Sequence, residues 1–131
     1  MRVLFAASEV APIIKLGGLG DVAGALPKAL TALGVNIDVI VPFFPIAKTK
    51  NFKIDKQSNL SVFFGGETYQ VEVFKTTLTD QQTEVFLLRE PRMFNTGGVD
   101  AFANNISETE MFAFFNRCVV EFVKSRLNTY D

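Results

Sequence analysis

The sequence contains no histidine and no tryptophan, and it has a single cysteine among its 131 residues. Without histidine, the chain lacks the commonest general acid or base and the commonest neutral nitrogen ligand of metals, so we expect neither imidazole catalysis nor a metal site within it. Cys118 has no partner for an internal disulfide, and its apolar neighbours predict a helix in which a free thiol acts as a small hydrophobe. A reducing compartment is therefore expected.

A large excess of charge of either sign is also missing. Lysine and arginine number 13 against 14 aspartate and glutamate, a formal net charge of −1 that argues against nucleic acid as a partner. No apolar run approaches the length of a membrane span, and the short run after Arg2 is unlike a signal peptide. With 48% hydrophobic and 21% charged residues, the composition is globular, and we expect a cytoplasmic protein without a membrane partner.

Hydrophobic spacing predicts a βαβ unit in the first third of the chain. Residues 3–7 form an unbroken apolar run, which is typical of a buried parallel strand. Apolar residues then recur at helical spacing over residues 19–33, where Pro27 predicts a kink or a break and Gly34 ends the helix. Residues 35–41 predict the second strand, and the crossover between the two strands should be right-handed.

The middle of the chain predicts a hairpin followed by another strand. Residues 60–78 alternate around a Gly65–Gly66 turn, and residues 84–88 return as an apolar run. The charges of residues 48–56 indicate a solvated, mobile stretch. Together these features predict an α/β fold: a Rossmann-like three-layer domain with a mainly parallel sheet and a β-hairpin insertion.

The last quarter predicts a long loop and a capped helix. Residues 89–106 contain proline and paired glycines, and loops of this length are usually functional or mobile. Ser107 and Glu110 form a capping-box pattern at the beginning of a helix that extends to about Leu127. Because a sheet of this kind should continue with another strand, we expect the natural protein to run on beyond Asp131.

Residues 15–22, which read KLGGLGDV, indicate chemistry most directly. They lie between the first predicted strand and the first helix, at the carboxyl end of a parallel strand, where α/β folds bind their ligands. Glycines let the backbone approach a ligand closely, and the first N–H groups of a helix have no partner within it. Together with the helix dipole and the ammonium of Lys15, these features predict a cradle for a diphosphate.

Three interpretations of this segment compete. A glycine-rich turn would serve only to let the helix pack on the strand. A dinucleotide fingerprint would use Gly18, Gly20 and Gly24 in a nicotinamide- or flavin-binding domain, but the preceding loop is long and the second strand does not end in an acidic residue. A sugar-nucleotide site suits the longer loop, the lysine before paired glycines, and Asp21 in the first turn.

Several segments closely resemble the N-terminal signature of bacterial glycogen synthases and plant starch synthases. They read SEVAP, KLGGLGDV, ALPKAL, FLL and MFAFF, in residues 8–12, 15–22, 25–30, 86–88 and 111–115. The resemblance covers nearly the whole chain, is weak over residues 48–83, and rests most on the KLGGLGD stretch. Residues 100–105 depart from the family, whose loop at this place is usually richer in Gly, Tyr and Asp.

The resemblance implies a retaining transfer of glucose from ADP-glucose to the 4-hydroxyl end of an α-1,4-glucan. Family members have the GT-B fold, with two Rossmann-like domains and the active site in the cleft between them. Residues 1–131 would then form part of the N-terminal, acceptor-side domain. The C-terminal domain would be absent, and the fragment would be inactive alone. No catalytic residue, metal or cofactor is implied within this part of the enzyme.

Carried over by position, Lys15 and the backbone of Gly17 and Gly18 would contact the donor diphosphate. Asp21 would help to hold the donor, and Glu9 would line the acceptor side of the cleft. Each charged residue also has a structural interpretation: Lys15 as a surface lysine, Glu9 as a solvated loop residue, and Asp21 as a carboxylate that stabilises a helix N-terminus.

Two questions stay open. Phe43 and Phe44, after the second predicted strand, could stack on a sugar, although buried packing is favoured. The chain could also be a stand-alone nucleotide-sugar or glucan-binding or regulatory module. The sequence does not choose between ADP-glucose and UDP-glucose.

Overall fold

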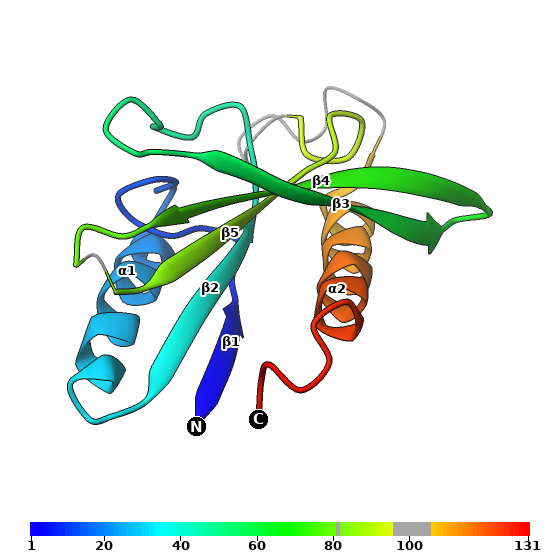
Figure 1. The fold of residues 1–131 in the computed structure, drawn as a ribbon. Coiled ribbons are helices and arrows are strands. Elements are labelled where there is room, and N and C mark those ends of the chain that lie inside the picture. Colours follow the sequence, from blue (N-terminus) through cyan, green and yellow to red (C-terminus); the bar gives the residue numbers. More distant parts are fainter. Residues whose placement is uncertain (81, 96–105) are drawn as a thin grey trace.

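A computed structural model describes residues 1–80, 82–95 and 106–131. The described elements are β1 (Arg2–Ala6), α1 (Gly18–Thr31), β2 (Asn36–Pro42), β3 (Asp55–Phe64), β4 (Glu67–Thr77), β5 (Glu84–Arg89) and α2 (Glu108–Lys124). The strands form one sheet in the order β1-β2-β5-β4-β3. Figure 1 shows α1 on one face of this sheet and α2 on the other, which confirms the expected three-layer α/β arrangement.

The first three strands of this order are parallel. β1 pairs with β2, and β2 pairs with β5, so that Phe5 lies opposite Val39 and Ile40 opposite Phe86. β2 is buried at every position after Asn36, as expected of a strand covered on both faces. The carboxyl ends of the three strands therefore meet at one edge of the sheet, where the loops after them lie together.

The predicted hairpin extends the sheet on its far side. Gly65 and Gly66 have φ angles of 58° and 88°, in the left-handed region that glycine adopts without a steric penalty. β4 then pairs antiparallel with both β3 and β5, so two of the four strand pairings are parallel and two antiparallel. The sheet is thus parallel where the glycine-rich loop leaves it and antiparallel at the opposite end.

Two predictions about local structure were wrong. β3 begins at Asp55 instead of residue 60, so the stretch predicted to be solvated and mobile ends inside a strand. The polar first half of β3 is held by pairing with β4, where Lys56 and Glu72 form an ion pair of 2.8 Å. α1 also continues through Pro27 to Thr31, so the predicted break is wrong, whereas the alternative of a kink stays a prediction. Pro27 removes one backbone donor, and its ring is buried on the covered face of the helix.

Aromatic side chains of α2 fill the core on its face of the sheet. The rings of Phe122 and Phe86 lie 4.8 Å apart, and the ring of Phe114 lies 5.5 Å from that of Phe94. Cys118 is buried among them, and burial raises the pKa of its thiol to about 12. The helix begins as predicted, since the Ser107 hydroxyl accepts a hydrogen bond from the Glu110 N–H at 3.1 Å. None of the helices in residues 1–80, 82–95 and 106–131 is long and apolar enough to cross a bilayer.

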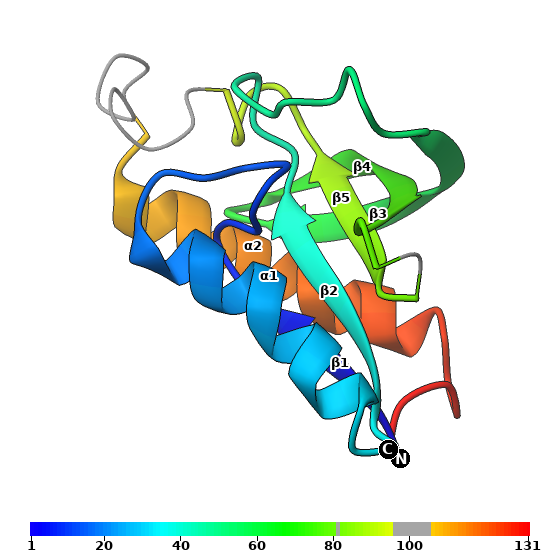
Figure 2. The same ribbon diagram turned by 90° about the vertical axis from the view of Figure 1, so that its left-hand side faces the viewer.

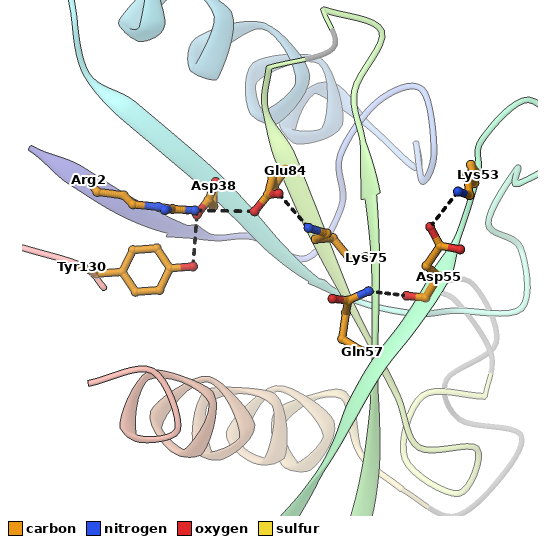
Figure 3. Close-up of polar contacts among 8 residues, drawn as sticks. All are labelled: Arg2, Asp38, Lys53, Asp55, Gln57, Lys75, Glu84 and Tyr130. Atoms are coloured by element: carbon orange, nitrogen blue, oxygen red, sulfur yellow. Dashed lines mark hydrogen bonds and ion pairs between the residues drawn. The ribbon is translucent and has the colours of Figure 1, made fainter. Parts of the chain in front are cut away.

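A polar network joins the two ends of the chain, which lie side by side at the amino end of β1 (Figures 1 and 2). The guanidinium of Arg2 donates to the buried carboxylate of Asp38 at 2.8 Å, and the Tyr130 hydroxyl donates to the same oxygen at 3.1 Å (Figure 3). Burial, together with the Asp38 charge, raises the pKa of Tyr130. The Asp131 N–H donates to the Arg2 carbonyl at 3.0 Å, so the last residue touches the first strand.

Candidate functional site

The loop between β1 and α1 is fixed to the core by its apolar residues. Val10, Ile13 and Ile14 are fully or almost fully buried. Val10 and Ile14 exchange two backbone hydrogen bonds of 2.9 and 2.8 Å, and the Ala11 N–H donates to the carbonyl of Gly20 at 2.9 Å. The loop is therefore an ordered support that presents residues 15–18 at the carboxyl end of β1.

Glu9 holds the first residues of the glycine segment, residues 15–22, through its side chain. Its carboxylate is buried, and one of its oxygens accepts hydrogen bonds from the N–H groups of Leu16 and Gly17, the latter at 2.9 Å. A carboxylate at the beginning of α1 also interacts favourably with the helix dipole. The interpretation of Glu9 as a solvated loop residue is therefore wrong, because the side chain holds the turn that leads into the helix.

At the beginning of α1, two exposed backbone N–H groups have no acceptor within the part of the chain that the structure describes. The expectation of unpaired N–H groups is wrong for Gly17, which is bonded to Glu9. Gly18 and Leu19 begin the helix, so their N–H groups have no intrahelical acceptor, and both residues are exposed. Among the described residues no acceptor for either group is found. Fewer N–H groups are therefore available at the beginning of α1 than the sequence suggests, and the exposed ones belong to Gly18 and Leu19.

The glycines of this segment have two different roles. A side chain at Gly24 would place its Cβ 2.5 Å from the carbonyl oxygen of Ala11, and one at Gly20 would meet the Glu9 carboxylate at 3.0 Å. These two glycines let α1 pack closely on the loop, as the structural interpretation proposed. A Cβ at Gly18 would have no neighbouring atom of residues 1–80, 82–95 or 106–131 within 4 Å. Packing therefore does not require a glycine at position 18. A ligand that approaches the backbone closely would require one there.

Lys15 and Asp21 lie beside this open amide pair. The ammonium of Lys15 and a carboxylate oxygen of Asp21 form an ion pair of 2.8 Å, and about half of each side chain is exposed, 53% and 59%. Exposed ion pairs of this kind are worth about 0–1 kcal/mol, so a bound anion can draw the lysine away at little cost. The structure thus brings Lys15, Gly17, Gly18 and Asp21 together, as their spacing in the sequence predicted.

Phe43 and Phe44 follow β2 at the same edge of the sheet. Phe44 is buried, and its ring packs edge-on against Phe94 at 6.1 Å, which confirms the core interpretation for this residue. Phe43 is half-buried, and its ring lies 5.5 Å from that of Phe74. A cavity of about 650 Å³ opens between these rings and Arg89. It lies after β2 and β5 and shares no lining residue with the glycine segment.

Acidic residues in the described ranges do not gather into a metal site. No group of three or more His, Cys, Asp or Glu side chains there is placed to hold a metal ion. The chemistry that these residues offer is the binding of an anion, through the two open amides and an ammonium that an exposed carboxylate holds in place.

This fold and loop define a Rossmann-like α/β domain that presents a glycine-rich helix N-terminus at the carboxyl edge of its parallel strands. The model of the starch synthase catalytic domain family matches residues 2–131, and the chain belongs to this family. The chain is 34% identical over 123 residues to a glycogen synthase of Hydrogenobaculum sp. (strain Y04AAS1) and 34% identical over 125 residues to one of Bacillus subtilis. The match covers 92% and 95% of this chain but 25% of each relative, so the chain spans about a quarter of their length.

A solved structure shares the arrangement of the elements. The catalytic domain of Starch Synthase IV from Arabidopsis thaliana, bound to ADP and acarbose, matches with a TM-score of 0.77 at 23% identity. The match covers 95% of this chain and 25% of that one. At this level of identity the likeness concerns the fold, and it agrees with the GT-B catalytic domain that the sequence motifs implied.

Proposed function

We propose that the chain forms the N-terminal, acceptor-side part of a glycogen or starch synthase. The complete enzyme transfers glucose from ADP-glucose to the 4-hydroxyl end of an α-1,4-glucan with retention of configuration. Membership of the starch synthase catalytic domain family and the glycogen synthase relatives support this proposal. Because the chain spans a quarter of those relatives, transfer is a property of the longer protein, with a second domain that closes the site.

The proposal of a donor site at this loop rests on one observation: the exposed backbone N–H groups of Gly18 and Leu19 lie beside the ammonium of Lys15. A diphosphate above Gly18 accepts hydrogen bonds from both amides, gains from the helix dipole, and attracts Lys15 away from its partner. Asp21 is then free to accept hydrogen bonds from hydroxyl groups of the donor. The ADP in the Arabidopsis structure supports a nucleotide diphosphate as the ligand.

The acarbose in the Arabidopsis structure supports a glucan-like partner for the complete protein. In this chain Glu9 is buried beneath the glycine segment, and both of the N–H groups that it binds belong to the loop. We infer that Glu9 contributes to the site mainly by positioning Leu16 and Gly17, while the acceptor lies on the solvent-exposed side of the loop.

Two variants of the full-length protein test the donor site by steady-state glucosyl transfer. Lys15→Ala removes a charge-assisted contact worth about 1.5–3 kcal/mol, so kcat/KM for ADP-glucose should fall by roughly 10- to 100-fold. Gly18→Ala adds a Cβ with no atom of the described residues within 4 Å, so it should not lower the melting temperature and should still weaken use of the donor. Both substrates, ADP-glucose and UDP-glucose, are measured in parallel.

Lys53→Ala serves as the matched control, since this exposed lysine pairs with Asp55 at 3.7 Å and lies outside the glycine segment. It should retain the kinetics of the unaltered enzyme. Unchanged donor kinetics in both Lys15→Ala and Gly18→Ala would exclude the diphosphate site. If the full-length protein binds ADP-glucose tightly but transfers no glucose to glucan, the result would favour the alternative of a binding module over an enzyme.

A further inference from the structure

A cavity lined mainly by apolar side chains opens at the carboxyl edge of the sheet, away from the glycine segment. Phe43, Phe52 and Phe74 line it and are half-buried, so part of each ring stays accessible. Its volume of about 650 Å³ lies within the roughly 300–1,000 Å³ of small-molecule sites. A flat apolar group that covers these rings would leave water together with them, which favours binding.

Backbone hydrogen bonds support the wall that residues 43–54 contribute to this cavity. The Ala47 N–H donates to the Phe44 carbonyl at 3.0 Å, which makes a turn after β2. The Lys48 N–H donates to the Ile13 carbonyl at 2.7 Å, and so it ties the wall to the loop before α1. Figure 1 shows the segment running from the end of β2 to β3 at the far edge of the sheet. The wall is therefore in place without a ligand.

The rim of the cavity carries an excess of positive charge. Residues 45–56 contain four lysines against one aspartate, which gives a net charge of +3 in a chain whose formal net charge is −1. All four lysines are exposed, and Lys48 and Lys50 alternate along the chain with residues that line the cavity. Lys53 pairs with Asp55 at 3.7 Å, whereas the other two lysines have no ion-pair partner in residues 1–80, 82–95 and 106–131. Like charges gathered beside an apolar wall attract an anion.

Arg89 adds a cation to the lining itself. It is the one formally charged side chain among the described residues that line the cavity, and 52% of this side chain is exposed. The carboxylate of Glu72 accepts from its Nη1 at 3.1 Å and also pairs with Lys56 at 2.8 Å. The hydrogen bond from Lys56 lowers the pKa of Glu72, so the carboxylate is ionised at neutral pH. Two cations therefore share one carboxylate, and the remaining positive charge is available to a bound anion.

We propose that this cavity binds a nucleoside monophosphate, a small ligand that joins a flat aromatic ring to a doubly charged anion. The base stacks on the half-buried rings of the walls, and the phosphate accepts hydrogen bonds from Arg89 and from the lysines of the rim. Thr49 and Asn95 supply polar groups for the edge of the base. The site is separate from the donor site at the glycine segment, and the proposal does not depend on that site.

The lining residues favour this ligand over a glucan chain. Each glucose unit presents several hydroxyl groups, so a glucan site needs many side chains that donate and accept hydrogen bonds. Besides Arg89, the polar side chains of the lining are Thr49 and Asn95, and no carboxylate is among the described lining residues. A neutral glucan would also leave the positive charge of the rim without a partner. A ring that carries one phosphate uses both the apolar walls and the charged rim.

Equilibrium dialysis of the full-length protein against adenosine monophosphate (AMP), adenosine and inorganic phosphate tests the proposal. AMP joins the two halves of the ligand, so it should bind at least about 10-fold more tightly than adenosine or phosphate alone. Lys50→Glu reverses an exposed charge at the rim and should weaken binding of AMP at least about 5-fold, with adenosine unchanged. Phe52→Leu removes one stacking ring and should weaken AMP and adenosine alike. Melting temperatures verify that both variants fold, and if Phe52→Leu does not, Lys50→Glu decides alone.

Lys124→Glu is the matched control, since Lys124 is an exposed lysine of α2 that pairs with Glu121 at 3.2 Å. It reverses the same charge outside the cavity and should retain the affinity for AMP. Lys15→Ala should retain it as well, because the glycine segment shares no lining residue with the cavity.

Four results would overturn the proposal. Loss of AMP binding in Lys15→Ala would place the ligand at the donor site instead. Phosphate that binds as tightly as AMP would indicate an anion site in which the rings have no part. A full-length protein that binds no AMP, or binds it equally well after Lys50→Glu, would exclude the cavity as a nucleotide site.

Discussion

Glu9 shows how one buried side chain sets the geometry of the glycine segment. Its carboxylate satisfies two N–H groups that precede α1, so it occupies donors that a phosphate would otherwise use. The same contact fixes the turn, and this leaves Gly18 and Leu19 as the open pair. If a diphosphate binds here as proposed, the Glu9 carboxylate would repel it, and the ammonium of Lys15 would offset that repulsion.

Replacing Glu9 by alanine should therefore reduce stability before anything else. Hydrogen bonds to a charged group contribute about 1.5–3 kcal/mol, and Glu9→Ala should lower the free energy of unfolding by an amount in this range. Glu9→Gln keeps an acceptor of the same shape and should lose less. Urea denaturation of the three proteins measures the difference. Equal stability of Glu9→Ala and the unaltered chain would contradict the role of Glu9 as the support of the loop.

The helix α1 combines a packing surface with an exposed N-terminal end. Its buried positions include Gly20, Ala23 and Pro27, which are all small or compact, and they let the helix lie close to the loop. Its first residue, Gly18, faces open space. The two kinds of glycine look alike in the sequence, and the atoms around them distinguish their roles.

Because the surroundings of Gly24 and Gly18 differ, replacement by alanine should affect stability differently at the two positions. Gly24→Ala should destabilise the protein by about 1–3 kcal/mol, because its Cβ would lie 2.5 Å from the Ala11 carbonyl oxygen and the backbone would have to move. This cost should exceed the gain of roughly 1 kcal/mol in helix propensity from glycine to alanine. Gly18→Ala, at the first residue of the helix, meets no such contact and is the control: it should keep or slightly raise the melting temperature. A Gly24→Ala protein that is as stable as Gly18→Ala would show that the close contact is relieved without cost.

At the scale of the whole domain, ionic and polar contacts join the first and last described residues, in addition to the pairing of the strands. Arg2, Asp38 and Tyr130 come from β1, β2 and the segment after α2, and they meet at one carboxylate (Figure 3). Glu84 extends this network toward β4, since it pairs with Lys75 at 2.8 Å. The contacts of Tyr130 and Asp131 thus hold the segment after α2 against β1 and β2.

Tyr130 should make stability depend on pH in the alkaline range. Its pKa is raised in the folded protein by burial and by Asp38, so the folded state holds the phenolic proton more tightly than the unfolded chain. The contribution is complete below the ordinary tyrosine pKa of about 10, and it is lost as pH rises toward the higher folded value. Tyr130→Phe should cost about 1 kcal/mol at pH 7 through the lost hydrogen bond.

Chemical denaturation at pH 7 and above pH 10 measures this effect. The unaltered protein should lose more stability over this interval than Tyr130→Phe, and the difference between the two cancels the titration of the other tyrosine and of the lysines. Parallel loss in both proteins would show that the phenol of Tyr130 does not couple to folding.

Much of the local structure followed from periodicity and from capping signals. The apolar runs gave β1, β2 and β5, and the glycine segment gave the start of α1 at Gly18. Pro27 misled the prediction because one missing donor in a helix covered by packing is tolerated. The first half of β3 was missed because its residues are polar, and pairing with β4 outweighs their low strand propensity.

The site was predicted as a group of residues but not as an arrangement of contacts. Lys15, Gly17, Gly18 and Asp21 are close in sequence, and a strand–loop–helix connection brings them together in almost any packing. Nothing in the sequence showed that Glu9 turns inward to bind Leu16 and Gly17, since the order of the loop depends on how Val10 and Ile14 enter the core. The one feature of the sequence that points to such a role is an acidic residue shortly before a helix N-terminus, where a carboxylate can accept hydrogen bonds from backbone N–H groups.

The amino-acid sequence alone thus determined the class of fold, the place of the glycine segment and the family, because helix and strand periods and a short motif are local properties. The tertiary structure decided which strands are neighbours and which N–H groups before α1 the Glu9 carboxylate binds. These features depend on contacts between residues far apart in the chain, where packing and hydrogen-bond satisfaction choose among arrangements that the local pattern permits equally.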